Sequence, residues 1–399
     1  MPVFQRADLL IPRPELLDRW PVIACDQFTS QPDYWRSVAE QTARVPSSYH
    51  IIFPEAELGA DEEMRIASIN RTMKDYLSAG VFRSFPKSYV YVERTLRSGE
   101  IRRGLIGVID LESYDYRDRA ETPVRATEKT VVTRIPPRVR IRSGAPIESS
   151  HVLLLCNDKD RRLLESIEKG EKLYDLELMQ GGGRLAGWLV DGENADRFDQ
   201  KLAAYINASK GNFCFAVGDG NHSLAAAKAC WEEWKRLDSS LIGSDHPARY
   251  AMVELENLFD PVQRFEPIHR IVRGVDPARL LGELEKLSGS CGGVPVRWFA
   301  QEKSGTICFD KSILPVDALQ RALDEYLNAY GGEIDYIHGE DVVRKLSRQE
   351  GAVAFLLPAI EKDELFRSIS RSGVLPRKTF SIGHAEEKRY YLECRKILP

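Results

Sequence analysis

Hydrophobic residues along this chain switch repeatedly between the spacing of an amphipathic helix and that of a strand, and this alternation limits the possible folds more than any other feature. Helical spacing occurs in residues 32–44, 61–77, 196–208 and 223–237. Short apolar runs typical of strands occupy residues 89–93, 105–109, 151–156 and 213–217. Such alternation excludes a helical bundle and an all-β sandwich. It predicts a mixed α/β fold in which helices flank mixed sheets.

The length of the chain, 399 residues, is enough for two or three modules at roughly 100–200 residues per domain. We expect an N-terminal region, residues 1–262, that contains a glycine-rich turn described below. A C-terminal α/β region, residues 263–399, begins after Asp260-Pro261 and alternates strands and helices again. The two regions could intertwine, because no long linker or low-complexity segment separates them.

Charge and hydropathy exclude several classes of partner. The chain has 56 lysines and arginines and 60 aspartates and glutamates, so its formal net charge is −4. This balance excludes a polybasic coat for nucleic acid or membranes over the whole protein. No segment approaches the roughly 20 apolar residues of a membrane helix, and the N-terminus lacks the apolar core of a signal peptide. We therefore expect a cytoplasmic protein without a membrane partner, whose seven scattered cysteines are reduced thiols.

The sequence Gly218-Asp-Gly-Asn-His-Ser223 is the most informative candidate site. It lies between the apolar run 213–217 and the helical segment 223–237. Gly218 and Gly220 would therefore let the backbone turn tightly and approach a ligand. The N–H groups of the following first helical turn favour an anion at this corner.

The side chains of this turn offer several chemical roles. Asp219 could orient a substrate hydroxyl or hold a metal ion, and His222 could bind a phosphate oxygen or transfer a proton. Asn221 or Ser223 could cap the helix. The alternative is a purely structural turn, since a strand-Gly-x-Gly-helix corner is common and differs from the dinucleotide fingerprint G-x-G-x-x-G.

A second candidate site is a local excess of positive charge between residues 125 and 142. Glu128 is the single acid in a segment with six cations, which are Arg125, Lys129, Arg134, Arg138, Arg140 and Arg142. Guanidinium groups grip phosphate in pairs, so this segment could serve a nucleotide. A solvated basic surface is the alternative. A nucleic-acid groove has little support, because no aromatic residue is interleaved with the cations.

Shorter features add further candidates. Asp26 follows an apolar run at an expected strand end, where active-site carboxylates are common in α/β folds. His269-Arg270 and Lys378 lie near the ends of apparent strands, and the glycine-rich residues 180–184 could approach a ligand or form a hairpin turn. Each of these features could instead be an ordinary turn or plain surface. No spacing indicates a metal site, a P-loop or a hydrolase nucleophile.

Seven motifs follow one another along nearly the whole chain. They are residues 22–30, 32–35, 127–130, 178–183, 218–223, 267–270 and 375–380. Together they resemble the prokaryotic family named domain of unknown function 1015. Members of that family carry a turn like Asp-Gly-His-His-Arg, which is similar to the turn of the ParB/sulfiredoxin superfamily, a group that includes nucleotide-binding partition proteins, sulfiredoxin and a free-serine kinase. The resemblance implies a ParB/sulfiredoxin-like core around the strand, the glycine turn and the helix.

Residue by residue, the resemblance implies that Asp219, Gly220 and His222 form a phosphate-contacting turn, with Glu128 from the family's charged motif. The sequence departs from the family turn in two places, with Asn221 for the first His and Ser223 for the Arg. Loss of that arginine removes a guanidinium for phosphate, which a cation of the basic segment would have to supply. Sulfiredoxin-like reductase chemistry is not expected, because no cysteine lies in the turn.

Three functions are compatible with these residues. The first is a nucleotide-dependent phosphotransferase that acts on a small hydroxylated metabolite such as an amino acid, with ATP or ADP and Mg²⁺ as cofactors. The catalytic candidates are Asp26, Glu128, Asp219 and His222, and the nucleotide-binding candidates are Gly218, Gly220, Asn221, Ser223, Arg138, Arg142, His269, Arg270 and Lys378. The second is a nucleotide- or phosphate-binding regulatory protein without chemistry. The third is a ParB-like DNA-associated protein, which only the superfamily analogy supports.

Overall fold

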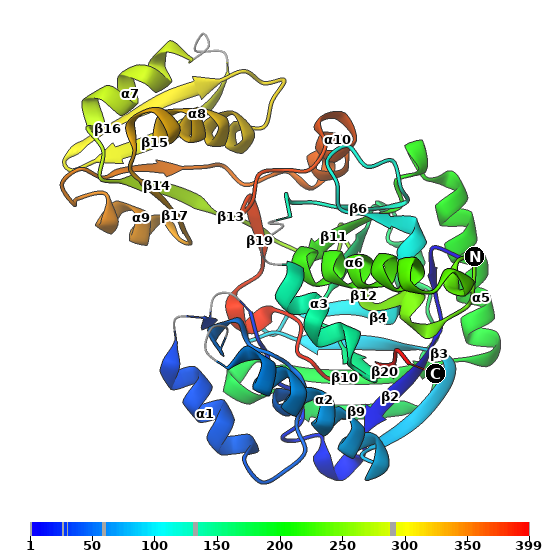
Figure 1. The fold of residues 1–399 in the computed structure, drawn as a ribbon. Coiled ribbons are helices and arrows are strands. Elements are labelled where there is room, and N and C mark those ends of the chain that lie inside the picture. The colour runs from blue at the N-terminus through cyan, green and yellow to red at the C-terminus, as the bar shows by residue number, and fades with distance from the viewer. Residues whose placement is uncertain are drawn as a thin grey trace. The chain divides into compact units, whose positions relative to one another are not determined.

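The computed structural model describes residues 2–25, 28–29, 31–57, 61–130, 135–287 and 293–398. The chain divides into two compact units (Figure 1). Unit 1 consists of Met1–Gln263 and Gly383–Pro399, and unit 2 consists of Arg264–Ile382. The last 17 residues, 383–399, which we expected in the second region, therefore belong to unit 1.

A mixed sheet of 13 strands forms the centre of unit 1. Its main path runs through β5 (Tyr114–Asp115), β6 (Val124–Ala126), β11 (Phe215–Asp219), β8 (Leu153–Cys156), β12 (Tyr250–Asn257), β4 (Ile101–Asp110), β3 (Phe82–Thr95), β2 (Ala7–Pro12), β20 (Cys394–Lys396) and β7 (Ile147–Ser149). In addition, β1 (Phe4–Gln5) pairs with β4, and β10 (Arg184–Val190) pairs with both β3 and β9 (Lys172–Glu177). Only residues 150–152 separate β7 from β8, so the path from β8 to β7 curls back on itself and the sheet is strongly curved.

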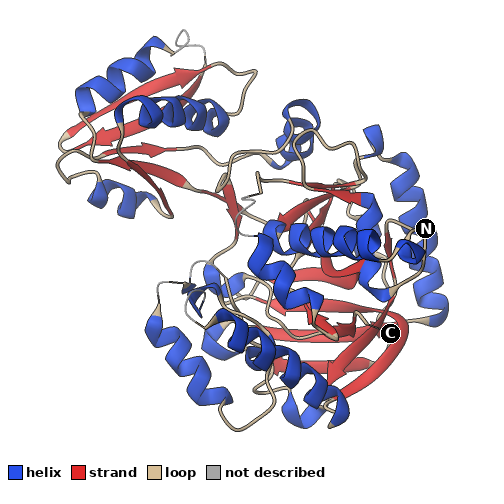
Figure 2. Ribbon diagram, viewed as in Figure 1, coloured by secondary structure: helices blue, strands red, loops and turns tan. Residues whose placement is uncertain are grey.

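Helices cover both faces of this sheet, as Figure 2 shows. They are α1 (Pro32–Thr42), α2 (Glu62–Ser78), α3 (Ile135–Ser143), α4 (Arg162–Glu165), α5 (Gly192–Ala208) and α6 (Asn221–Leu237). The largest core joins α1 and α2 to one face of the sheet, where Trp35 and Met73 belong to the same buried cluster as Val90. On the opposite face, the ring of Tyr89 contacts Phe198 of α5 at 5.1 Å between centroids. The predicted α/β class with flanking helices is confirmed.

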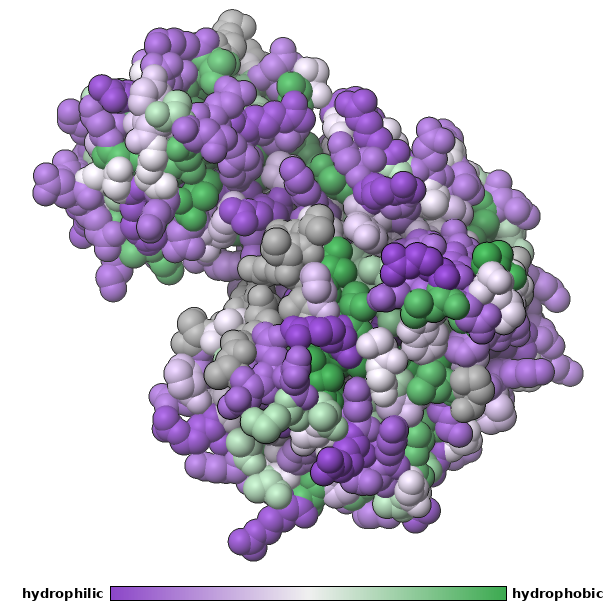
Figure 3. Space-filling view, viewed as in Figure 1, coloured by the Kyte–Doolittle hydropathy of each residue, from purple (hydrophilic) through white to green (hydrophobic). Residues whose placement is uncertain are grey.

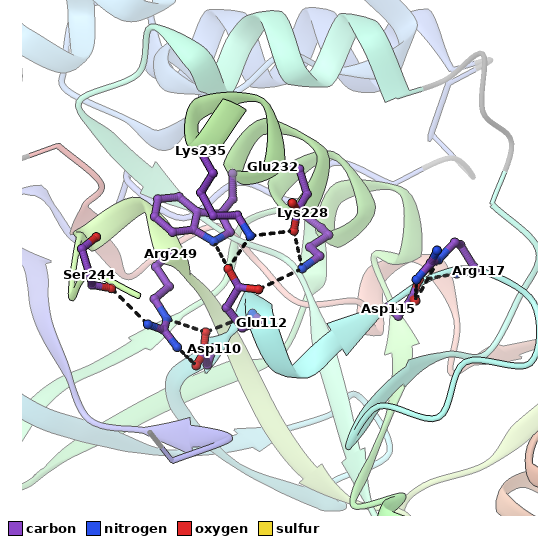
Figure 4. A network of polar contacts seen from close by, with 10 residues as sticks. Asp110, Glu112, Asp115, Arg117, Lys228, Glu232, Lys235, Ser244 and Arg249 are labelled. Carbon is purple, nitrogen blue, oxygen red and sulfur yellow. Dashed lines mark hydrogen bonds and ion pairs between the residues drawn. The ribbon is translucent and has the colours of Figure 1, made fainter. Parts of the chain in front are cut away.

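A polar network anchors α6 to the end of β4 (Figure 4). Glu112, two residues beyond β4, accepts hydrogen bonds from Trp231 Nε1 and Lys235 Nζ, both at 2.6 Å. Lys228 lies one helical turn before Glu232, and its Nζ is 3.7 Å from the carboxylate of Glu112. Beside this group, Asp110 and Arg249 form a bidentate pair at 2.7 and 2.9 Å. These contacts fix the long axis of α6 and therefore the position of the turn that precedes it.

Unit 2 is a separate α/β unit built on an antiparallel sheet. Its strand order is β16 (Lys303–Phe309), β15 (Val294–Ala300), β18 (Val353–Leu356), β14 (His269–Arg273) and β17 (Glu333–Ile337). Its helices are α7 (Pro277–Lys286), α8 (Pro315–Tyr330), α9 (Glu340–Leu346) and α10 (Lys362–Ser372), and a two-strand sheet pairs β13 (Phe265–Pro267) with β19 (Phe380–Ile382). Leu280 of α7, Leu323 of α8 and Phe355 of β18 share its main core.

The outer surface is largely hydrophilic in the view of Figure 3, with apolar residues in small scattered groups. Leu237 at the end of α6 is the most exposed of the large apolar side chains among the described residues, at 75 %. Isolated apolar residues of this kind are normal on a folded protein. Among the helices that the structure describes, none has the length and hydropathy needed to cross a membrane. The six cysteines within the described residues are not in disulfides, and Cys291 lies outside the described residues.

Candidate functional site

The glycine turn joins β11 directly to α6. β11 ends at Asp219 and α6 begins at Asn221, so Gly220 alone makes the corner. Gly220 has φ = +80°, a backbone conformation that residues other than glycine rarely adopt. A Cβ atom at this position would lie 2.9 Å from Cγ2 and 3.1 Å from Cα of Val152. Glycine is therefore required here for both its backbone conformation and its size.

Asp219 is held between the turn and the C-terminal segment of unit 1. Its Oδ1 accepts a hydrogen bond from the backbone N–H of Gly220 at 2.8 Å. Its Oδ2 lies 3.2 Å from Nζ of Lys388, whose side chain is only 10 % exposed. Burial alone would raise the pKa of Asp219, but Lys388, His151 and the backbone hydrogen bond outweigh it and lower the pKa. Asp219 is therefore a charged carboxylate at neutral pH.

His151 lies next to this carboxylate because β8 and β11 are antiparallel neighbours, with Asp219 opposite Leu153. Its Nδ1 shares a hydrogen bond of 2.5 Å with the hydroxyl of Tyr391. Burial lowers the pKa of His151 to about 4; the attraction of Asp219 opposes this, and the positive charges of Arg138, Arg389 and Lys388 add to the lowering. His151 is therefore a neutral imidazole at neutral pH, with the capacity to accept a proton or a hydrogen bond.

Asn221 ties the turn to the neighbouring segment 127–130. Its side-chain Oδ1 accepts from the backbone N–H of Thr127, and its Nδ2 donates to the Thr127 hydroxyl, both at 3.2 Å. That hydroxyl in turn donates to the carbonyl of Val217 at 2.7 Å. The parallel register of β6 and β11, with Ala126 opposite Val217, sets up these contacts. The structure thus brings the predicted motif that contains Glu128 to the side of the glycine turn.

A cluster of buried charges continues from Lys388 to the central strand β12. Arg389 is 4 % exposed and donates to Glu393 at 2.7 Å, to Glu254 at 3.3 Å and to the carbonyl of Ser150 at 2.9 Å. Next to Glu254, burial raises the pKa of Glu256 to about 8; Arg102 opposes this shift and Glu254 adds to it. Arg389 also contributes to the electrostatic environment of His151. The candidate site therefore lies next to a buried network of charged side chains.

The predicted site residues divide into groups. Gly218, Asp219, Gly220, Asn221, His222 and Ser223 lie in or directly after the turn, and Arg138 of α3 contributes to the electrostatics of His151 and Tyr391. Arg142, by contrast, binds Glu148 and the carbonyl of Tyr250. Asp26 and Arg134 lie outside the described residues.

The predicted cap of α6 is wrong. Gly220 itself occupies the N-cap position, so no side chain caps the helix from there. Asn221 is already inside the helix, and its amide is bound to Thr127. The physical reason is that Gly220, in the left-handed conformation, turns the chain in one step, so the helix begins at Asn221, two residues earlier than expected.

The remaining candidates lie together in unit 2. Arg270 is fully buried and donates to the carbonyls of Ile268 and Lys378, at 2.5 and 2.8 Å, and to Gln320 at 2.9 Å. Nδ1 of His269 accepts from the backbone N–H of Leu357 at 3.2 Å. Burial lowers the pKa of His269 to about 4, with an opposing contribution from Glu340. The structure thus joins two separate motifs, 267–270 and 375–380, inside unit 2.

Three residues of the site were missed by the sequence analysis: His151, Lys388 and Tyr391. His151 is the first residue of the predicted strand 151–156, so the sequence indicated only a structural role for it. Lys388 and Tyr391 belong to a C-terminal segment with no periodicity and no motif. Only the return of this segment to unit 1 places them at the turn.

The described residues contain no group of three or more His, Cys, Asp or Glu side chains that could hold a metal ion.

Comparison with solved structures finds distant similarity. A mutant free serine kinase in complex with ADP is 13 % identical, with a TM-score of 0.41, and the match covers 73 % of this chain and 91 % of that one. A conserved hypothetical protein from Pyrococcus furiosus is 13 % identical, with a TM-score of 0.36, and covers 71 % and 90 %. SbnI from Staphylococcus aureus, with a C-terminal truncation, is 10 % identical, with a TM-score of 0.39, and covers 70 % and 82 %. Identities and TM-scores this low say nothing about activity.

No curated protein matches the sequence. The family described as protein of unknown function, DUF1015, matches residues 7–395, which contain most of unit 1, all of unit 2 and the complete glycine turn. Because this match extends over nearly the whole chain, the protein belongs to the DUF1015 family.

Proposed function

We propose that this protein is a nucleotide-dependent phosphotransferase that acts on a small hydroxylated metabolite, with an amino acid as one candidate. The observation that supports this function best is the pairing of Asp219 with Lys388 at the glycine turn in front of α6. A carboxylate, a buried ammonium and the N-terminus of a 17-residue helix meet there. The helix terminus and the cation favour phosphate oxygens, and the carboxylate suits a hydroxyl group or a nucleotide-bound Mg²⁺.

Each group has a distinct role in the proposed reaction. Lys388 and Arg138 stabilise the negative charge of the transferred phosphoryl group. Asp219 orients the acceptor hydroxyl or binds the Mg²⁺ that accompanies ATP. The hydroxyl oxygen forms a bond to the γ-phosphorus while the bond between that phosphorus and ADP breaks, and the hydroxyl proton passes to a base. His151, neutral and next to Asp219, is our candidate for this base, and Glu128 is the alternative.

A second function, nucleotide or phosphate binding without chemistry, is favoured by one specific observation. Asn221 stands where the resemblance expects a histidine, and its amide is committed to Thr127. A turn that uses this side chain for internal contacts has fewer groups for catalysis. The ParB-like core, a role with DNA and the cytoplasmic location remain predictions.

The test is a thermal-unfolding screen with ATP, ADP, AMP and pyrophosphate, each with and without Mg²⁺. A ligand at about 100 times its dissociation constant adds roughly 2.7 kcal/mol of stability, which shifts the melting temperature measurably. We expect Asp219→Asn and Lys388→Met to lose the shift. The matched controls are Asp175→Asn and Lys172→Met, because these two residues form an exposed pair of 2.9 Å in the same unit.

The two functions are separated by incubating the protein with ATP, Mg²⁺ and a panel of hydroxylated metabolites. Phosphorylated product that depends on Asp219 supports the phosphotransferase. A nucleotide-specific shift without transfer or hydrolysis supports the binding protein instead. No shift with any phosphate compound refutes both functions.

A further inference from the structure

Arg94 holds two distant chain segments together beneath the candidate site. Arg94 lies on β3 of unit 1 and is 4 % exposed. Nε and Nη2 donate to the carbonyl of Gly182 at 3.2 and 2.8 Å. Nη1 donates to the carbonyls of Lys388 at 2.6 Å and Glu387 at 3.3 Å, and Nη2 also binds the carbonyl of Glu386. A planar guanidinium with fixed donor directions can serve four carbonyls at once, which an ammonium cannot.

The triple-glycine loop is shaped to fit the same segment. A Cβ atom on Gly182 would lie 2.2 Å from the hydroxyl oxygen of Tyr390. That hydroxyl donates to the carbonyl of Met179 at 2.8 Å, and the guanidinium of Arg94 lies 4.8 Å from the centre of the Tyr390 ring. Since only glycine allows this close approach, residues 179–182 and 386–390 form one packed unit around Arg94.

We propose that Arg94 is a positioning residue that, with the triple-glycine loop, fixes residues 386–391 so that Lys388 and Tyr391 reach Asp219 and His151. This inference rests on the proposed function for its consequence, since the positioned ammonium is the group that we expect to bind phosphate. The geometry also gives the otherwise unexplained glycine motif at 181–183 a role. Arg94 binds the backbone carbonyl of Lys388 and not its side chain, so it acts on the site through the backbone of Lys388.

The first measurement is limited trypsin digestion of the full-length protein, followed by mass spectrometry. Trypsin cleaves after lysine and arginine, and the side chains of Lys388 and Arg389 are 10 % and 2 % exposed, so both sites are protected when the segment is clamped. We expect Arg94→Met and Arg94→Lys to be cut at these positions at least tenfold faster than the wild type. Arg83→Met is the matched control, because Arg83 lies on the same strand as Arg94 and donates to the carbonyl of Leu173 at 2.9 Å, outside residues 386–391.

The second measurement is pyrophosphate binding by isothermal titration calorimetry. We expect Arg94→Met to weaken binding at least tenfold, as Lys388→Met does, and the double variant to bind no more weakly than Lys388→Met alone. Such non-additivity is the result of two residues that act through one group. If Arg94→Met fails to fold, Gly182→Ala carries the same test, since its new methyl group displaces Tyr390.

The outcomes separate the two proposals. Faster cleavage at Lys388 and Arg389 together with unmeasurable binding of pyrophosphate and nucleotides to the wild type supports the clamp and refutes the proposed function. Tight pyrophosphate binding to Arg94→Met, with both sites still protected, refutes the clamp and leaves the proposed function standing.

Discussion

Replacement of Gly220 by alanine tests most directly whether the turn requires glycine. The left-handed conformation costs a residue with a Cβ about 1–2 kcal/mol. Alanine recovers about 0.4–1 kcal/mol of this, because it restricts the unfolded chain. The new methyl group would also lie 2.9 Å from Val152 Cγ2 and 3.1 Å from the Val152 backbone, and overpacking of this kind costs about 1–3 kcal/mol. The expected loss of unfolding free energy is therefore about 1–5 kcal/mol.

Gly243→Ala separates the two contributions. Gly243 has φ = +75°, close to that of Gly220, but its Cβ position has no atom within 4 Å. Its substitution should cost only the conformational part, about 1 kcal/mol. The assay is urea unfolding followed by tryptophan fluorescence, which reports mainly on unit 1 because Trp298 is the only tryptophan of unit 2. Equal losses for the two variants would refute the packing argument, and a negligible loss for Gly220→Ala would refute the turn conformation itself.

Three further predictions concern charges and close contacts in unit 1. Burial alone would raise the pKa of Glu148, but two arginines lower it from 4.5 to about 2. The charged form of Glu148 therefore stabilises the fold fully above pH 4.5, and this stabilisation disappears as the pH falls towards 2. Urea unfolding should show a loss of about 3 kcal/mol for Glu148→Gln at pH 7 and a smaller one at pH 3, whereas a constant difference would contradict the charge argument. Glu112→Gln should lower the unfolding free energy by about 1 kcal/mol, because it weakens the contacts to Trp231 and two lysines. The measurement is thermal unfolding, in which Glu232→Gln should have a smaller effect because Glu232 binds only those two lysines. Gly104→Ala would place a methyl group 2.3 Å from a carboxylate oxygen of Glu254. We therefore expect the unfolding free energy in urea to fall by about 1–3 kcal/mol. An unchanged unfolding midpoint would mean that the Glu254 side chain moves aside freely.

The sequence is a good guide to the fold where one hydrophobic period continues over several residues. The expected strand 213–217 and helix 223–237 correspond to β11 and α6. The expected hairpins at 89–109 and 176–190 are present as the β3–β4 and β10–β9 pairs. These elements could be predicted because apolar periodicity and glycine turns are local properties.

The strand β12 shows why other parts could not be predicted. It is buried along its whole length, yet it contains Glu254 and Glu256. Charged residues are typical of exposed segments, so the sequence gives no indication that this strand is central. These acids are buried because Arg102 and Arg389 reach them from other segments. Such compensation depends on tertiary contacts and leaves no trace in the local sequence.

The candidate site shows the same division. Asp219, Gly220 and Asn221 could be predicted because they form one short motif, and the structure adds Lys388 from 169 positions further along the chain. No spacing rule relates two residues so far apart. The partners of a local motif are chosen by chain topology, which only the complete fold determines.

The return of residues 383–399 to unit 1 has a consequence for how the protein is made. During synthesis, β20 and Lys388 leave the ribosome after all of unit 2, so the curved sheet lacks a strand until residues 394–396 have been made. Contacts between segments this far apart form slowly, because a long loop must close first. A nascent chain that stops anywhere in unit 2 would have the glycine turn without its lysine. Formation of the Asp219–Lys388 pair therefore has to wait until the chain beyond unit 2 has been synthesised.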